Sequence, residues 1–164
     1  MKIKTAIISI LISFSALAQE FSFEDEDFSH QVFAGSKFFM DEDYFRAFSA
    51  GYGYTKGNFT LGGEFEFYDQ MGNNAWFAGL FLKAVPLKWG RVGLFFQTGV
   101  QYPITKETKV YDFVNVNIMA GIKRFSLISN NPAAIEASVG YDFRFINGQT
   151  KYVLFPKLST VFFF

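Results

Sequence analysis

The sequence predicts an all-β fold: an eight-stranded antiparallel up-and-down transmembrane β-barrel with a cleaved N-terminal signal peptide. Three observations lead to this prediction: an export signal, regularly spaced turn-like pieces, and alternation of apolar and polar residues between them. The chain also holds 24 Phe and 8 Tyr, although its mean hydropathy of +0.14 is close to neutral. Strands with one apolar and one polar face account for both numbers.

Residues 1–18 are interpreted as a signal peptide. They have a basic start, an apolar run that ends near Phe14, and Ala16 and Ala18 at the small-residue positions that signal peptidase accepts. The apolar run is too short to cross a bilayer as a helix, which needs about 20 residues. We therefore expect cleavage after Ala18.

This cleavage would leave residues 19–27 as an acidic periplasmic leader and residues 28–164 as the barrel domain. Removal of Lys2 and Lys4 from the 15 bases leaves 13 against 15 acids. A chain without an excess of Lys and Arg is not expected to bind nucleic acid. The sequence has no Cys, which excludes disulfides and a lipid-anchored lipoprotein.

Seven pieces rich in Gly, Asn, Asp or Pro have the composition of turns. They are residues 41–43, 55–58, 71–74, 86–90, 103–109, 129–132 and 147–149. Seven turns separate eight strands. The 137 residues from 28 to 164 allow about 17 for each strand and its connection, and a tilted membrane strand uses roughly 9–11 of these. Connections of about six or seven residues are therefore expected.

Several segments alternate with the period of two that a two-faced strand requires. In Ile135–Phe145 the odd-numbered residues are apolar or aromatic, and the even-numbered ones are Glu136, Ser138, Gly140, Asp142 and Arg144. Residues 59–67, 91–102 and 114–122 alternate in the same way. The first two strands are less regular, and their polar face is expected to carry Gln31, Phe33, Gly35, Lys37, Ser49, Gly51 and Gly53.

A secreted β-sandwich would also alternate, and two further features favour the barrel. The polar faces mix Gly, Ser, Asn and Gln with charges of both signs, as the narrow interior of a small barrel requires. Tyr and Trp lie near segment ends, where belts at two membrane interfaces would place them. These residues are Tyr52, Tyr54, Trp76, Trp89, Tyr102 and Tyr152.

The C-terminal segment resembles the terminal signature of outer-membrane barrel proteins. Phe164, Phe162 and Leu158 fit the alternating pattern, whereas Thr160 and Pro156 depart from it. The segments 120–123 and 135–141 are similar to the closing hairpins of small porin-like barrel domains of the OmpA and OmpX type. The resemblance covers residues 28–164.

This resemblance implies an outer-membrane location with both termini in the periplasm. It also implies that Phe162 and Phe164 form an assembly signal, read by the barrel-assembly machinery through the C-terminal strand. It carries no catalytic residues.

The polar faces together predict a structural network of charges in the lumen. Its expected members are Lys37, Glu64, Glu66, Lys83, Arg91, Glu136, Asp142, Arg144 and Lys157. Buried charges have to be paired, and this set has about as many bases as acids. Glu64 and Glu66 would share the lumen, so cation binding or acid/base chemistry is the alternative to structural pairing.

The function expected from these features is a structural or interaction role in the outer membrane, as a monomer surrounded by lipid. A narrow channel for ions or small solutes is the first alternative, and a lipid-modifying enzyme is the second. Such enzymes use a His with a Ser or Asp near the outer rim, whereas His30, the single histidine, would lie beside Ser29 at the periplasmic rim. The sequence shows no phosphate loop, no metal-spaced His/Cys cluster and no nucleophile elbow, so no enzymatic activity, cofactor or metal is expected.

Overall fold

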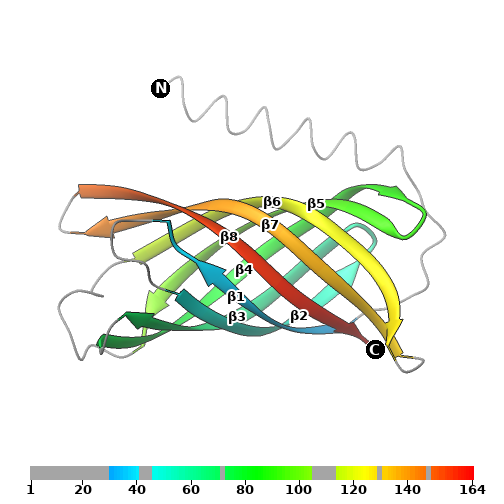
Figure 1. The fold of residues 1–164 in the computed structure, drawn as a ribbon, viewed down its shortest axis with the longest axis horizontal. Coiled ribbons are helices and arrows are strands. Elements are labelled where there is room, and N and C mark those ends of the chain that lie inside the picture. Colours follow the sequence, from blue (N-terminus) through cyan, green and yellow to red (C-terminus); the bar gives the residue numbers. More distant parts are fainter. Residues whose placement is uncertain (1–29, 41–45, 71–72, 105–113, 129–130, 147–148) are drawn as a thin grey trace, which may run out of the picture.

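The computed structural model describes residues 30–40, 46–70, 73–104, 114–128, 131–146 and 149–164. The predicted signal peptide and leader lie outside these residues. The described residues form eight antiparallel strands, each paired with the next, and β1 also pairs with β8 to close one barrel (Figure 1). The strands are β1 (His30–Phe38), β2 (Arg46–Lys56), β3 (Phe59–Gln70), β4 (Asn73–Trp89), β5 (Val92–Pro103), β6 (Val114–Ile128), β7 (Asn131–Ile146) and β8 (Gln149–Phe163). The predicted fold class is confirmed.

The described residues contain no helix that is both long and apolar enough to span a membrane.

The two ends of the barrel are named here by one residue each. The Phe164 end holds His30, Phe164 and the turns 57–58 and 90–91, whereas the Met40 end lies at the opposite ends of the same strands (Figure 1). These two turns, among the described residues, are each two residues long and begin with a glycine of φ +57°, at Gly57 and Gly90. A positive φ at the first turn position suits the twist of a tight hairpin.

The pairing register fixes the tilt of the strands. Paired residues lead from His30 once around the barrel to Leu154 of β8. Leu154 O accepts a hydrogen bond of 3.1 Å from Met40 N. A path that follows paired residues once around the barrel therefore starts at residue 30 and ends at residue 40, which is a stagger of ten residues. With usual strand spacings, this stagger corresponds to a tilt of about 40°.

Most connections are shorter, and most strands longer, than expected. β4 spans 17 residues and runs through Pro86, so the predicted turn at residues 86–90 is wrong, and only Gly90 and Arg91 separate β4 from β5. The register shifts between Ala84 and Leu87. A bulge of this kind accommodates Pro86, which cannot donate a backbone hydrogen bond to the sheet.

The outer face of the barrel is apolar along its middle and aromatic at both ends. Leu61 and Leu80 point outward with 63% and 64% of their surface exposed, as a lipid-facing band requires. Exposed Tyr54 and Trp89 lie at the Phe164 end, and exposed Trp76, Tyr102 and Tyr152 lie toward the Met40 end. The inner face carries the candidate site.

Candidate functional site

The lumen is filled by side chains, including two clusters of buried apolar residues. One cluster lies toward the Met40 end and includes Phe39, Tyr68, Phe77 and Phe155. The other lies toward the Phe164 end and consists of Phe33, Phe81, Ala134, Val161 and Phe163, with Phe125 packed against it. The buried side chains of the lumen include Phe33, which was expected there, and also Phe77, Phe81, Phe95 and Phe163.

Rings fit inside so narrow a barrel because glycines stand opposite them. Phe81 pairs across the strands with Gly62, and a Cβ added to Gly62 would lie 2.4 Å from the Phe81 ring. Phe33 likewise pairs with Gly51, and a Cβ added to Gly51 would lie 2.4 Å from the Phe33 ring. Each ring thus occupies the space that a side chain on the neighbouring strand would need. The glycines of the polar faces are therefore packing positions.

One group of charges is centred on Glu136 of β7. Lys83 Nζ donates to both carboxylate oxygens of Glu136, at 2.9 and 2.7 Å. Lys123 Nζ lies 3.3 Å from Glu136 Oε1. All three side chains are at most 6% exposed. A single carboxylate therefore holds two ammonium groups, from β4 and β6, inside the barrel.

A second group joins β1, β3, β7 and β8 nearer the Met40 end. Lys37 Nζ lies 2.6 Å from Glu66 Oε1 and 3.9 Å from Asp142 Oδ1. Lys157 Nζ lies 3.3 Å from Glu64 Oε2. These charges connect strands that are not neighbours in the sheet, with one or two strands between the partners, so they link separate parts of the wall.

Amide side chains extend this second group. Gln101 Nε2 donates to Glu64 Oε1 at 2.8 Å, and Asn115 Nδ2 donates to Gln101 Oε1 at 2.8 Å. The same Asn115 nitrogen lies 3.4 Å from the Tyr68 hydroxyl oxygen. Glu64 therefore has two different partners, an ammonium and an amide.

The cations of the lumen also lie against aromatic faces. Lys123 Nζ is 4.5 Å from the centre of the Phe163 ring, and Lys37 Nζ is 4.6 Å from that of Phe155. The Arg144 guanidinium is 4.8 Å from the centre of the Phe39 ring. Such contacts are worth roughly 0.5–2 kcal/mol each, more where water is excluded. The Phe residues therefore stabilise the charges as well as filling space.

The structure places eight of the nine predicted network residues in the lumen, namely Lys37, Glu64, Glu66, Lys83, Glu136, Asp142, Arg144 and Lys157. Arg91 is the exception, and its prediction is wrong: it is exposed in the turn between β4 and β5. The alternation from residue 91 to residue 102 had placed Arg91 inside, but β5 begins only at Val92.

Lys123 was missed by the sequence prediction, as were the roles of Gln101, Asn115 and Tyr68. The signal for Lys123 was available, because it continues the inward series that contains Asn115 and Asn117. Tyr68 likewise continues the series of Glu64 and Glu66. Both were lost because the predicted strands ended one residue too early. With Lys123, the buried charged side chains of the described residues number five bases and four acids.

His30 lies at the Phe164 end, outside the charge groups. Its Nδ1 is hydrogen-bonded to the Tyr52 hydroxyl, and its ring packs against those of Tyr54 and Phe164. Ser29, considered with it as a possible catalytic partner, lies outside the described residues. The described contacts of His30 are those of an aromatic cluster at the barrel seam.

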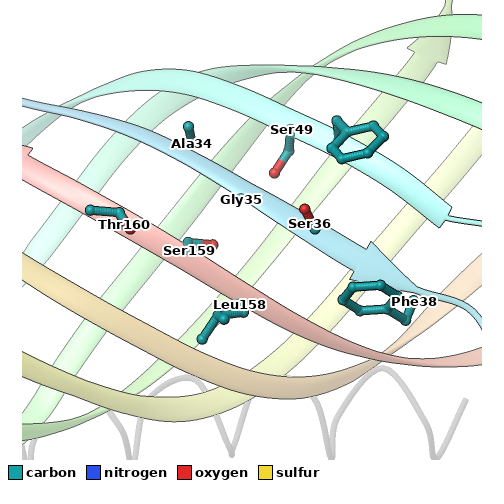
Figure 2. A pocket seen from close by; sticks show the side chains of 9 residues that line it. Ala34, Gly35, Ser36, Phe38, Ser49, Leu158, Ser159 and Thr160 are labelled. Atoms are coloured by element: carbon teal, nitrogen blue, oxygen red, sulfur yellow. The ribbon is translucent and has the colours of Figure 1, made fainter.

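A groove of about 450 Å³ follows the outer side of β1 (Figure 2). Figure 2 shows Ala34, Gly35 and Ser36 of β1 between Ser49 of β2 and the segment Leu158–Thr160 of β8. Its remaining lining residues are Phe38 and Phe48. The lining carries hydroxyl groups but no charged side chain, and its exposed rings are continuous with the apolar outer face.

The fold occurs in several solved structures of membrane barrels. A de novo designed transmembrane β-barrel matches with a TM-score of 0.62 at 12% identity, covering 87% of this chain and 100% of the designed chain. The N-terminal β-barrel domain of Pseudomonas aeruginosa OprF matches with a TM-score of 0.61 at 15% identity, covering 82% of this chain and 96% of that one. Neisserial surface protein A matches with a TM-score of 0.54 at 11% identity, covering 81% and 93%.

No protein-family model and no curated protein matches the sequence. The structural matches nevertheless define the class: the chain has the fold of a small transmembrane β-barrel, and two of the matches are bacterial surface or outer-membrane barrels. The predicted resemblance to eight-stranded outer-membrane barrels is confirmed at the level of the fold.

Proposed function

We propose that this protein is an integral outer-membrane barrel with a filled lumen, which acts as a structural or interaction element and not as a pore. The lumen is the observation that carries this proposal. Its charges are paired across the barrel between rings that pack on glycines. An ion crossing it would have to separate buried pairs, which costs several kcal/mol for each uncompensated charge.

The proposed location is the outer membrane, with the Phe164 end toward the periplasm. The apolar band and the aromatic residues near both ends support residence in a bilayer. A monomer is proposed because the barrel closes on itself through β1 and β8, so no strand edge is open to a second chain. The barrel-assembly machinery is the proposed partner of β8 during insertion, and no enzymatic role is proposed.

Recording from planar bilayers with purified, refolded protein tests the closed lumen. The unmutated chain should give at most small, intermittent currents, whereas Glu64→Gln with Glu66→Gln should increase them, because Lys37 and Lys157 lose their nearest carboxylates. Trp76→Phe, on the outer face, serves as the control and should change nothing. Steady openings of porin size from the unmutated chain would refute the closed lumen.

A narrow channel is the second candidate, and one observation favours it. The side-chain amide nitrogens of Gln97 and Asn117 are buried and have no hydrogen-bond partner among the described residues. Gln97 pairs in register with Lys83, and Asn117 pairs with Asp142. Polar groups outside the ion pairs therefore adjoin both charge groups. Gln97→Leu separates the candidates, since it should reduce any real conductance and leave a closed barrel unaffected.

A further inference from the structure

Two lysines share one inward-facing row at the Phe164 end of the lumen. Lys88 of β4 pairs in register with Gly93 of β5, and Gly93 pairs with Lys123 of β6. Residues paired across neighbouring strands point to the same side of a sheet, and Gly93 and Lys123 are both buried on the inner side. Lys88 therefore also points inward, and the glycine leaves no side chain between the two lysines.

The ring of Phe125 lies against both ammonium groups. Lys88 Nζ is 5.7 Å from the centre of this ring, and Lys123 Nζ is 5.2 Å from it. Lys123 is only 3% exposed, whereas Lys88 is partly exposed. The two lysines, here called the lysine pair, thus place one ammonium group inside the lumen and another nearer its opening.

This end of the lumen has an excess of positive charge. Lys123 Nζ lies 3.3 Å from Glu136 Oε1, but Lys83 already donates to both oxygens of that carboxylate. The other buried acids of the described residues belong to the second charge group, nearer the Met40 end. Within the described part of the chain, three ammonium groups, with that of Lys88, therefore adjoin one carboxylate. Buried charge in excess requires a counter-charge.

The sequence places acids close to this end. Residues 24–27 are Glu-Asp-Glu-Asp, and β1 begins shortly after them at His30, which lies at the Phe164 end. The six residues from the first of these acids to His30 can span about 20 Å, whereas eight strands with this tilt form a barrel about 16 Å across. Lys123 Nζ also lies 4.5 Å from the centre of the Phe163 ring, and Phe163 pairs with the residue after His30. The lysine pair is therefore within reach of the acids.

We propose that the lysine pair is a carboxylate-binding site, and that acidic side chains of residues 24–27 of the same chain occupy it. Ammonium groups donate charge-assisted hydrogen bonds to carboxylates, and the short tether gives the acids a high effective concentration at the site. The segment and the site belong to one end of the barrel, so the inference holds for either orientation in a membrane. It rests on the barrel fold and is independent of the closed lumen proposed above.

Cross-linking with a carbodiimide tests the contact directly, because it joins a carboxylate to an amine without a spacer. The refolded protein is treated in phosphatidylcholine vesicles, and digestion with mass spectrometry locates the links. Links should join residues 24–27 to Lys88 or Lys123. Lys56 provides the internal reference, since it is exposed at the same end, beside the turn 57–58, and it should form few links.

The labelling rate of Lys88 with an amine-reactive reagent gives a second measurement. Replacement of the four acids by their amides should speed this labelling by roughly fivefold, the effect of losing one ion pair near a surface. Labelling of Lys56 should stay unchanged. The matched control replaces Asp41, Glu42 and Asp43, which follow β1 at the other end, by their amides, and it should leave the labelling of Lys88 as it was.

Four outcomes would overturn the proposal. Links to Lys56 as frequent as those to Lys88 would show that the segment has no preferred site. Links between isotopically labelled and unlabelled chains would assign the acids to a second copy. Unchanged labelling of Lys88 after replacement of the four acids would exclude them as its ligand. Slowing of this labelling by inorganic phosphate in the unmutated chain, but not by chloride at equal ionic strength, would assign the site to a free anion.

Failure of this site can be told apart from failure of the barrel assignment. A heat-dependent gel shift shows whether each variant has inserted, and planar-bilayer recording shows whether its lumen is closed. An inserted, closed barrel that forms no links to the lysine pair would refute the site alone.

Discussion

Lys83 on β4 and Glu136 on β7 are joined across the lumen by two hydrogen bonds of 2.9 and 2.7 Å from one ammonium to both carboxylate oxygens. Their strands are separated by two others on one side of the ring and four on the other, so the pair bridges distant parts of the wall. Lys123 shares the same carboxylate. Glu136 is therefore the single acid on which two buried cations of the described structure depend.

Glu136→Gln should destabilise the barrel by about 3–5 kcal/mol, the usual cost of removing one partner from a buried ion pair. It would leave Lys83 and Lys123 as unneutralised neighbours in a water-poor lumen. Urea unfolding in detergent micelles or vesicles, followed by tryptophan fluorescence, measures the change. The matched control replaces Lys83 and Lys123 by Met and Glu136 by Leu, and it should recover most of the lost stability, because apolar groups of similar volume often replace buried ions without loss. Unchanged stability of Glu136→Gln would show that the pair contributes nothing.

The spacing of the turn-like pieces predicted the strand number, the composition of the polar faces and the aromatic residues near segment ends favoured the barrel, and alternation predicted most inward-facing residues. The residues at 136, 138, 140, 142 and 144 share one face for a geometric reason, since successive side chains of a strand point in opposite directions. A polar face that mixes charged residues with glycines is typical of a narrow barrel interior, where side chains must both pair and fit. The sequence could therefore place eight of the nine network residues where the structure has them.

Strand ends and partners could not be predicted in the same way. Pro86 suggested a turn, but β4 passes through it at a register shift, and the turn contracts to Gly90 and Arg91. This change moves Arg91 from the lumen to the rim. The pairing of Lys83 with Glu136 depends on the stagger around the whole barrel. This stagger is set only when β1 pairs with β8, so it cannot be predicted from any single strand.

Gly62→Ala should destabilise the barrel by about 1–3 kcal/mol through overpacking. Its added Cβ would lie 2.4 Å from both the Phe81 ring and the Tyr52 carbonyl oxygen. Gly63, the next residue, faces outward, and a Cβ there would meet nothing closer than 3.6 Å. Gly63→Ala is therefore the matched control and should be tolerated. Equal effects of both variants in urea unfolding would contradict the packing of Phe81 on Gly62.

Val139→Arg and Ser138→Arg should each destabilise the barrel, but for different reasons, although the residues are adjacent. Val139 is 54% exposed on the outer face, so a charge there should cost roughly 2–4 kcal/mol in a bilayer. Ser138 points inward, donates to Met119 Sδ at 3.7 Å and pairs with Lys157. Ser138→Arg should therefore be partly rescued by Lys157→Met, and Val139→Arg should not. Free tolerance of Arg at position 139 would argue against a lipid-facing surface.

Deletion of Phe164 should reduce the yield of folded barrel, because this residue completes the seam between β1 and β8. Its backbone N donates to His30 O at 3.0 Å, and its O accepts from His30 N at 3.1 Å. Its ring also stacks on His30 with centres 6.0 Å apart. Each backbone bond contributes about 1 kcal/mol, and both lie at the place where the barrel closes. The measurement is the fraction of heat-modifiable protein, in membranes after expression and in detergent after refolding.

Phe164→Ala separates the two roles of this residue, because it keeps the backbone bonds and removes only the ring. If the ring is an assembly signal, Phe164→Ala should insert poorly in cells but refold normally in detergent. If the residue acts only through the seam, Phe164→Ala should resemble the unmutated chain in both settings, and the deletion should be defective in both. Phe162→Ala, which removes the neighbouring outward ring of the same strand, tests whether the signal extends beyond the last residue. Insertion of the shortened chain at the unmutated yield would refute both roles.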